Sequence, residues 1–378
     1  MEAQISLPRE LPQATRPVSL TDARLLAKLR GLAVDALRQM YQPQAGLFAF
    51  RLRLRDGRPV PEGLSPRYTA ITLLGLVHEY PDAVRSTLHG DDPLALCERL
   101  ATQVIQGGNL GDVALTLWAA TLWGQDRPAE ALRRRLLALL LPEGGYPTVE
   151  LSWALMAATL DPVLIRNGCA ERLAGRLLRA FQPDSGLFPH RVGGDGGMRG
   201  HVACFADVVY PIQALSTYHA LTGEAAALAA ARTCGERAVR NQGPDGQWWW
   251  HFDYRTGEPL ERYPVYTVHQ HGMGPMALAA LADAGGPAFP AAVSKSLGWL
   301  AYTPEIDGSI IDWDHQLIWR KVARREPPKL ARKLQAGLSY LHAGLRMPGL
   351  DGLLPPRTVD FECRPYELGW LLYAWPAE

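Results

Sequence analysis

The 378-residue chain carries 39 Lys and Arg residues against 38 Asp and Glu residues, for a formal net charge of +1, and 47% of its residues are hydrophobic. Because the charges are balanced and form no long runs, electrostatics favours neither nucleic acid nor an anionic membrane as a partner. No stretch approaches the roughly 18 to 20 apolar residues of a membrane span, and the hydrophobic content is sufficient for a large core.

The cysteines and the N-terminal segment predict a cytoplasmic protein. The five cysteines form no CxxC pair, so we expect neither disulfides nor a zinc site. They are Cys97, Cys169, Cys204, Cys234 and Cys363. Residues 1–18 are polar and contain prolines, which indicates an extended segment without the apolar stretch of a signal peptide. We expect no metal and no other cofactor.

The hydrophobicity pattern predicts helix after helix, separated by Gly- and Pro-containing loops, with almost no alternating strand pattern. One set is amphipathic and covers about 21–41, 91–106, 127–140, 169–181, 224–240, 289–301 and 330–346. The other set is apolar on most sides and covers about 67–80, 111–123, 148–160, 204–221, 266–283 and 363–375, with 310–323 as a more polar seventh candidate. Since the sets alternate and the apolar helices must be buried, we predict one all-α domain with an inner ring sheathed by an outer ring.

A loop signature recurs where the chain passes from an outer to an inner helix. It reads YQPQAGLF at 41–48, FQPDSGLF at 181–188 and NQGPDGQW at 241–248, and such repetition is typical of closed or solenoidal arrays. The Gln-x-x-x-Gly-x-aromatic form resembles the repeat of α/α-toroid proteins. That superfamily includes squalene-type terpene cyclases and protein prenyltransferases, and similar toroids carry sugar epimerases, glycoside hydrolases and polysaccharide lyases. Segments 266–278 and 362–374 also resemble a little-characterised bacterial group associated with exopolysaccharide biosynthesis.

The resemblance implies a toroid of six or seven helical hairpins whose inner helices all point their N-termini toward one mouth. Backbone N–H groups and positive dipole ends gather there, which favours an anionic or hydroxyl-rich ligand. The candidate substrate-binding residues near these N-termini are His190, Arg191, Asp207, Tyr210, Tyr266, Gln270, His315, Glu362 and Arg364. Structural roles remain open for three of them: a first-turn acid for Asp207, a core aromatic for Tyr210, and an ion pair with Glu367 for Arg364.

Residues 241–276 concentrate the aromatic and titratable groups that a polar-ligand pocket needs. Of three consecutive tryptophans, we expect Trp248 to be the buried repeat residue and Trp249 or Trp250 to face the ligand. Tyr254 adds a further stacking surface.

His269 and His271 form a His-x-His pair at the start of an inner helix. Positions i and i+2 lie about 200° apart on a helix, so the two could share a metal ion only in an extended segment. We expect one imidazole to face the pocket as an acid or base, and the other to pack behind it.

Asp312 and Asp314 are the best paired carboxylates of the sequence, and sugar chemistry often uses two carboxyl groups with different pKa values. In an extended segment they share a face. In a helix they diverge, and the partner carboxylate must come from Asp253, Asp207 or Glu362. An N-cap role for Asp312 at a helix over 313–323 is the structural alternative.

These residues predict a carbohydrate-active enzyme that cleaves or isomerises a glycan linked to polysaccharide metabolism. Proton transfer is assigned to Asp312 or Asp314 with His269 or His271. Arg191 or Arg364 would hold a carboxylate or hydroxyl groups of a small-molecule or oligosaccharide substrate.

Two other functions remain open. A terpenoid cyclase of class II type would use Asp312 or Asp314 as proton donor, although the Asp-x-Asp-Asp motif of such enzymes reads here as Asp312-Trp313-Asp314-His315. A non-catalytic glycan-binding protein would keep the stacking aromatic residues and need none of the carboxylates.

Overall fold

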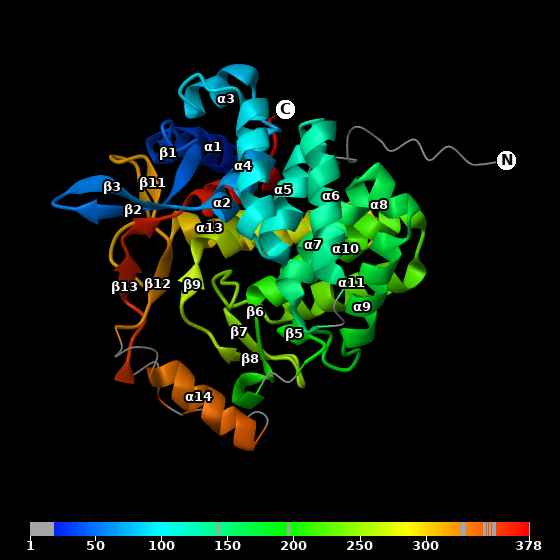
Figure 1. The fold of residues 1–378 in the computed structure, drawn as a ribbon. Coiled ribbons are helices and arrows are strands. Elements are labelled where there is room, and N and C mark those ends of the chain that lie inside the picture. The colour runs from blue at the N-terminus through cyan, green and yellow to red at the C-terminus, as the bar shows by residue number, and fades with distance from the viewer. Residues whose placement is uncertain are drawn as a thin grey trace.

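The computed structural model describes residues 19–141, 144–194, 197–325, 330–342, 345, 347, 349 and 353–377. Within them, two concentric rings of six helices form the body of the molecule (Figure 1). The outer helices are α1 (Leu20–Met40), α4 (Pro93–Gly107), α6 (Asp126–Leu140), α9 (Cys169–Ala180), α11 (Ala225–Arg240) and α13 (Pro290–Ala301). The inner helices are α2 (Pro66–Leu76), α5 (Leu110–Leu122), α7 (Thr148–Leu160), α10 (Phe205–Thr222), α12 (Gly274–Asp283) and α16 (Pro365–Ala374).

The inner ring is closed. Its helices contact one another in the order α2, α5, α7, α10, α12 and α16, and α16 packs back on α2. The residues of α5 from Val113 to Ala120 are all buried, which explains why the inner helices are apolar on every side. The predicted all-α toroid with alternating outer and inner helices is confirmed. Short helices α3 (Pro81–Thr87) and α8 (Pro162–Arg166) lie in connections outside the ring.

The sequence left open whether six or seven hairpins form the ring, and the described residues form six. Residues 310–323 form strands β10 (Ile311–Asp312), β11 (Leu317–Ile318) and β12 (Lys321–Ala323) in place of an inner helix. The turn of the β10–β11 hairpin places Gln316 at a φ of 57°, a left-handed conformation that interrupts a helix. The last expected outer helix exists as α14 (Leu330–Leu341), but it contacts strand β8 (Glu258–Glu261) and the 3₁₀ turn η1 (Gly197–Arg199).

The strands all lie in connections that lead from an outer to an inner helix, so they gather at one face of the ring and form the rim of its mouth. They pair in small antiparallel sheets. The remaining strands are β1 (Tyr41–Gln42), β2 (Leu47–Arg55), β3 (Arg58–Leu64), β4 (Tyr146–Pro147), β5 (Arg191–Val192), β6 (Val202–Cys204), β7 (His251–Asp253), β9 (Val265–Tyr266), β13 (Thr358–Asp360) and β14 (Glu362–Cys363).

The recurring loops use their glycine and their aromatic residue in the same way. Gly46, Gly186 and Gly246 have φ values of 58°, 73° and 101°, which favour glycine. The aromatic residues two positions later, Phe48, Phe188 and Trp248, are 0%, 0% and 2% exposed and therefore anchor each loop in the core. The structural role expected for Trp248 agrees with this burial.

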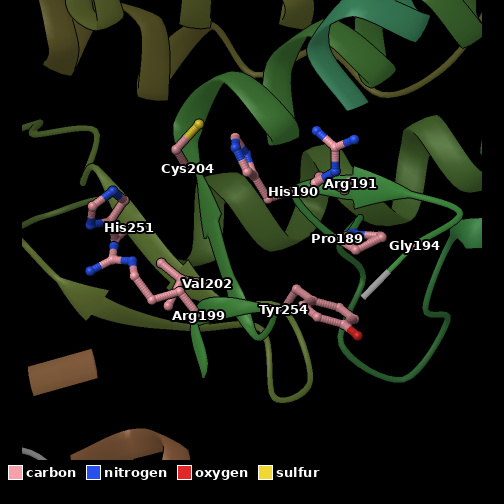
Figure 2. Close-up of a pocket in the computed structure, with 10 residues that line it drawn as sticks. Pro189, His190, Arg191, Gly194, Arg199, Val202, Cys204, His251 and Tyr254 are labelled. Atoms are coloured by element: carbon pink, nitrogen blue, oxygen red, sulfur yellow. The ribbon is translucent and has the colours of Figure 1, made fainter. Parts of the chain in front are cut away.

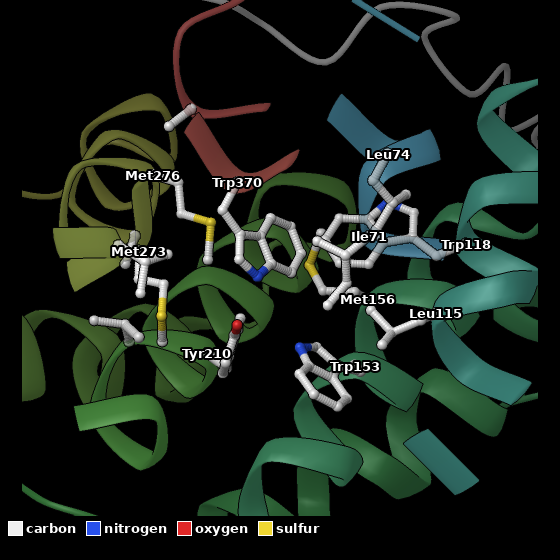
Figure 3. Close-up of a cluster of buried hydrophobic side chains, with 14 of the residues drawn as sticks. Ile71, Leu74, Leu115, Trp118, Trp153, Met156, Tyr210, Met273, Met276 and Trp370 are labelled. Carbon is white, nitrogen blue, oxygen red and sulfur yellow. The ribbon is translucent and has the colours of Figure 1, made fainter. Parts of the chain in front are cut away.

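The deep part of the ring is a packed core (Figure 3). The ring of Trp370 lies 5.8 Å from that of Trp118 and 5.8 Å from that of Tyr210, and Tyr210 meets Trp153 edge-on at 5.1 Å between ring centroids. The core role considered for Tyr210 is therefore the one the structure shows. The rim strands lie at the N-terminal ends of the inner helices.

Two sequence expectations concern regions outside this body. The extended segment expected at 1–18 lies outside the described residues. Among the described helices, none combines the length and the apolar character that crossing a membrane requires.

Closure of the ring depends on glycine at the contact between α2 and α16. A Cβ atom at Gly75 would overlap the backbone carbonyl of Gly369, while Gly298, exposed on α13, has free space around it. We expect Gly75→Ala to lower the free energy of unfolding by about 1–3 kcal/mol through overpacking, measured by urea denaturation. Gly298→Ala is the matched control and should raise it by about 0.5–1 kcal/mol. Equal effects of the two substitutions would contradict a tight contact.

Candidate active site in the mouth of the toroid

A cavity of about 480 Å³ opens in the mouth beside the N-terminus of α10 (Figure 2). Its wall is formed by the loop that follows Phe188, by η1 and β6, and by the turn after β7. The side chains that line it include His190, Arg191, Arg199, Cys204, His251 and Tyr254. It therefore combines imidazole, guanidinium, thiol and phenol groups, which is the composition of a site for a polar ligand.

His190 and Asp207 form the most defined pair of this cavity. Asp207 is the third residue of α10 and is fully buried, and its Oδ2 accepts hydrogen bonds from the backbone N–H of Cys204 (2.8 Å) and from Nδ1 of His190 (2.9 Å). The His190 side chain is 53% exposed. The hydrogen bond and the negative charge of Asp207 raise the pKa of His190. The pairing with Asp207 therefore favours the protonated imidazole, which can donate a proton to a ligand in the cavity.

Two arginines add positive charge to the cavity wall. Arg191 and Arg199 are exposed, and Arg191 is oriented by a hydrogen bond of 2.5 Å to the backbone carbonyl of Gly145. Guanidinium groups bind carboxylate, sulfate and phosphate oxygens in a fork geometry and also donate to hydroxyl groups. His190 and Arg191, both predicted as substrate-binding residues, line this cavity.

Aromatic rings continue from the cavity across the mouth. Trp250 is half-buried and stacks on His251 at 3.8 Å between ring centroids, and Tyr266 meets Trp250 edge-on at 5.5 Å. Tyr254 is half-buried at the wall of the cavity. Tyr254 therefore offers an aromatic ring to the cavity, and Trp250 lies against His251, which lines it.

Trp249 points elsewhere, and its predicted contact with the ligand is wrong. It is 5% exposed, meets Tyr263 edge-on at 5.8 Å, and has the guanidinium of Arg262 over its ring at 5.4 Å. The ring covers Gly243 so closely that no Cβ atom would fit there. The three consecutive tryptophans thus lie in different surroundings: Trp248 in the core, Trp249 against Tyr263 and Arg262, and Trp250 against His251 at the mouth.

The structure contradicts the proton-transfer role predicted for His269 and His271. Both are buried in the one-turn π-helix η2 (His269–Met273) at the start of α12, and burial lowers the pKa of each to about 3. Each is therefore neutral at pH 7 and poorly placed to accept a proton. Gln270, between them, accepts from the backbone N–H of Trp248 (3.3 Å) and donates to the carbonyl of Tyr266 (3.2 Å), so it holds the aromatic stretch.

Asp312, Asp314 and His315 lie on the β10–β11 hairpin at the outer rim. Asp312 accepts from the backbone N–H (3.0 Å) and from Nδ1 (2.8 Å) of His315, whose Nε2 lies 3.0 Å from the carbonyl of Gly57 at the tip of the β2–β3 hairpin. Asp314 is exposed. The helix that Asp312 would cap does not form, and neither carboxylate is paired with His269 or His271. The predicted catalytic constellation is therefore not assembled.

Asp253 is occupied by an ion pair. Its carboxylate, 2% exposed, accepts from Nε (2.9 Å) and Nη2 (2.6 Å) of Arg255, and Nη2 also donates to the carbonyl of Ser339 on α14 at 2.8 Å. This arrangement ties α14 to β7. It explains Asp253 as a structural residue rather than the catalytic one predicted.

A second charged cluster surrounds the N-terminus of α16. Glu362 is 2% exposed and lies 2.8 Å from Arg51, 3.3 Å from Arg320 and 2.5 Å from Arg364. Burial alone would raise the pKa of Glu362, but the charges of Arg364 and Arg320 outweigh it and lower that pKa. Glu362 and Arg364 therefore neutralise one another and join β14 to β2, which places both in a structural ion cluster.

The neighbouring Glu367 differs from Glu362. Burial raises the pKa of Glu367 to about 7, although Nε of Arg320 lies 3.3 Å from its carboxylate. Arg320 also lies 5.0 Å from the ring of Tyr266. Glu367 is thus a buried carboxyl group at the N-terminus of α16 whose pKa lies near neutral pH.

The sequence did not single out four groups of this mouth for function: Arg199, His251, Cys204 and Arg320. The spacing Cys204-x-x-Asp207 was the one available signal, because a pair at N-cap and N3 opens a helix with both side chains on one side. The others come from rim strands and turns that have no periodic pattern of their own.

No protein-family model matches the sequence, and no curated protein matches it. Among solved structures, cellobiose 2-epimerase from Bacillus thermoamylovorans is similar with a TM-score of 0.63 and 12% identity, over 94% of this chain and 98% of that one. An unsaturated glucuronyl hydrolase specific for heparin gives 0.60 and 13%, over 93% and 96%. A possible GH105 family member from Klebsiella pneumoniae gives 0.56 and 12%, over 99% and 98%. The chain has the α/α-toroid fold of these proteins, as predicted. The finer likeness to the exopolysaccharide-associated group stays a prediction.

Burial of His269 and His271 predicts an acid-sensitive fold. The folded pKa of each is about 3, whereas an unfolded histidine titrates near 6.5, so the unfolded chain binds more protons as the pH falls. Each should remove up to about 1.4 kcal/mol of unfolding free energy per pH unit below that value. His271→Met should weaken this dependence by one proton in urea unfolding between pH 7.5 and 4.5. Met273→Leu, in the same turn, should leave the slope unchanged, and an unaltered slope in His271→Met would contradict the burial argument.

Proposed function

We propose that the chain is a carbohydrate-active enzyme that cleaves or isomerises a glycan by acid–base chemistry in the mouth of the toroid, as part of polysaccharide metabolism. One observation carries the proposal: an exposed imidazole, hydrogen-bonded at Nδ1 to a fully buried carboxylate, faces a cavity of about 480 Å³ lined by two arginines. This arrangement provides a proton-transfer group next to a binding site for a polar ligand.

Six residues in or beside the cavity have a role in this proposal. His190 transfers the proton, while Asp207 fixes the ring orientation and stabilises the imidazolium that forms. Arg191 and Arg199 hold a carboxylate or hydroxyl groups of an oligosaccharide, and Trp250 and Tyr254 stack on sugar rings. The fold is shared with glycan-processing enzymes, which supports the substrate class by analogy, whereas the chemistry rests on the site.

The terpenoid cyclase alternative fits the structure less well. A terpenoid carbocation needs a mainly apolar cavity. The deep lumen is filled by buried side chains such as Trp118, Trp153 and Trp370, and the cavity beside α10 is lined by two arginines. The carboxylates that would donate the proton, Asp312 and Asp314, lie on the outer hairpin. A non-catalytic glycan-binding protein is consistent with the same cavity and would bind glycans without converting them.

A cytoplasmic location belongs to this proposal. It is supported by the five cysteines, all of which are free thiols, since thiols are kept reduced in that compartment.

The first test is substitution of the proposed proton-transfer group. We expect His190→Gln to lower kcat/KM by roughly 10²- to 10⁴-fold, as loss of a general acid–base group does, with little effect on thermal stability because the side chain is exposed. Turnover would be followed by mass spectrometry against panels of acidic and neutral oligosaccharides and of prenyl diphosphates. Addition of water to a sugar would identify hydrolysis, and a product of unchanged mass would identify isomerisation.

His315→Gln is the matched control, since His315 forms the same hydrogen bond to Asp312 (2.8 Å) outside the cavity. It should leave turnover unchanged. Loss of activity in His315→Gln together with full activity in His190→Gln would return the site to the outer rim. Cyclisation of a prenyl substrate would contradict the proposed substrate class, and saturable glycan binding without turnover would indicate a binding protein.

The second test concerns the pairing itself. Asp207 raises the pKa of His190, so Asp207→Asn should lower that pKa, and the NMR titration of the imidazole in EDTA-treated protein should move to lower pH. The stabilisation that the pair provides is complete below the unfolded pKa near 6.5 and is lost as the pH rises through the higher folded pKa. A His190 titration that stays in place in Asp207→Asn would show that the two groups are not coupled.

A further inference from the structure

Three potential metal ligands of different chemical type meet at the wall of the cavity. One ligand atom each of His190, Cys204 and Asp207 can be chosen so that all three lie within 4.8 Å of one another. Cys204 is the N-cap of α10 and Asp207 its third residue, so one helical turn presents both, and the loop after Phe188 brings His190 to them. Figure 2 shows the side chains of His190 and Cys204 next to each other.

The arrangement leaves one buried donor atom without a partner. Oδ2 of Asp207 accepts two hydrogen bonds, but Oδ1, on a residue that is 0% exposed, has no hydrogen-bond partner within the described part of the chain. A buried carboxylate oxygen is costly when no donor or cation satisfies it. A cation between Asp207, Cys204 and His190 would satisfy it.

The donor set selects the kind of cation. Thiolate, imidazole and carboxylate are the ligands that Zn²⁺ takes in tetrahedral sites, whereas Mg²⁺ and Ca²⁺ require oxygen ligands. The thiolate and the carboxylate would balance the double charge of the ion. A thiol ligand gives up its proton when it binds the metal.

We infer that His190, Cys204 and Asp207 bind one Zn²⁺ ion whose fourth coordination position faces the cavity. Three protein ligands and one open position are typical of catalytic rather than structural zinc. The ion would replace the proton that His190 and Asp207 share, and would offer a Lewis acid beside Arg191 and Arg199. This inference changes one role in the proposed function, because with zinc bound the metal ion, and not the protonated His190 imidazole, would act on the substrate. It does not depend on the identity of the glycan.

The experiment uses the full chain, stripped with EDTA and titrated with Zn²⁺ alone by calorimetry in buffers of different ionisation enthalpy. We expect one tight site per chain and release of the thiol proton. With Co²⁺ as a spectroscopic probe, a thiolate-to-metal charge-transfer band should appear in the near ultraviolet. Absence of a stoichiometric site, or of the thiolate band, would overturn the inference.

Variants locate the site. Cys204→Ala and Asp207→Asn should lose the tight site, and His190→Gln, whose side chain is exposed and not needed for folding, should lose it as well. Cys97→Ala is the matched control, because Cys97 is a buried thiol on the outer helix α4 and should bind zinc like the unaltered chain. Tight binding that survives in both His190→Gln and Cys204→Ala would place the zinc elsewhere and refute the site. Because no glycan enters this titration, its failure is distinguishable from a failure of the proposed enzymatic activity.

Discussion

The structure depends on the contact that closes the inner ring. Helices α2 and α16 come from opposite ends of the chain and pack backbone to backbone at Gly75 and Gly369, where a Cβ atom at Gly369 would lie only 2.8 Å from the carbonyl of Ile71. This approach brings the last inner helix beside the first, and it allows Trp370 to fill the lumen. With the lumen filled, polar chemistry is confined to the mouth, where the N-termini of the inner helices converge.

The charged groups of the mouth form two clusters, one beside α16 and one beside α10. On the α16 side, Glu362 forms ion pairs with arginines that hold β14 and β2 together, so these charges stabilise the fold. On the α10 side, Asp207 has one exposed imidazole as a partner and an unsatisfied oxygen, so charge remains available to a ligand. The proposed function and the proposed zinc site both follow from this second, incompletely satisfied half.

Several residues that the sequence predicted to form one site lie apart in the structure, and the sequence pattern did not indicate why. His269 and His271 were predicted to reach the pocket because they lie between an aromatic loop and an inner helix. In the structure they lie in a π-helical turn, and both rings are buried. Asp312 and Asp314 had the spacing of a catalytic pair, yet a reverse turn carried them to the outer rim. The sequence predicted His190 and Arg191 as site residues because they follow a repeat loop directly, and in the structure both line the cavity beside α10.

The sequence by itself determined the two rings of helices. The period and the apolar character of each helix decide whether it belongs to the buried inner ring or to the outer ring that covers it. The glycine and aromatic positions of the loops indicate where the chain passes from an outer to an inner helix. The sequence also predicted a ligand site at the helix N-termini. Only the tertiary structure decided which polar groups meet, because rim strands of two to nine residues carry no helical period and take their positions from neighbours distant in the chain. The meeting of His190, Cys204 and Asp207 is such a case, because its members share no spacing that the sequence alone could associate with a metal.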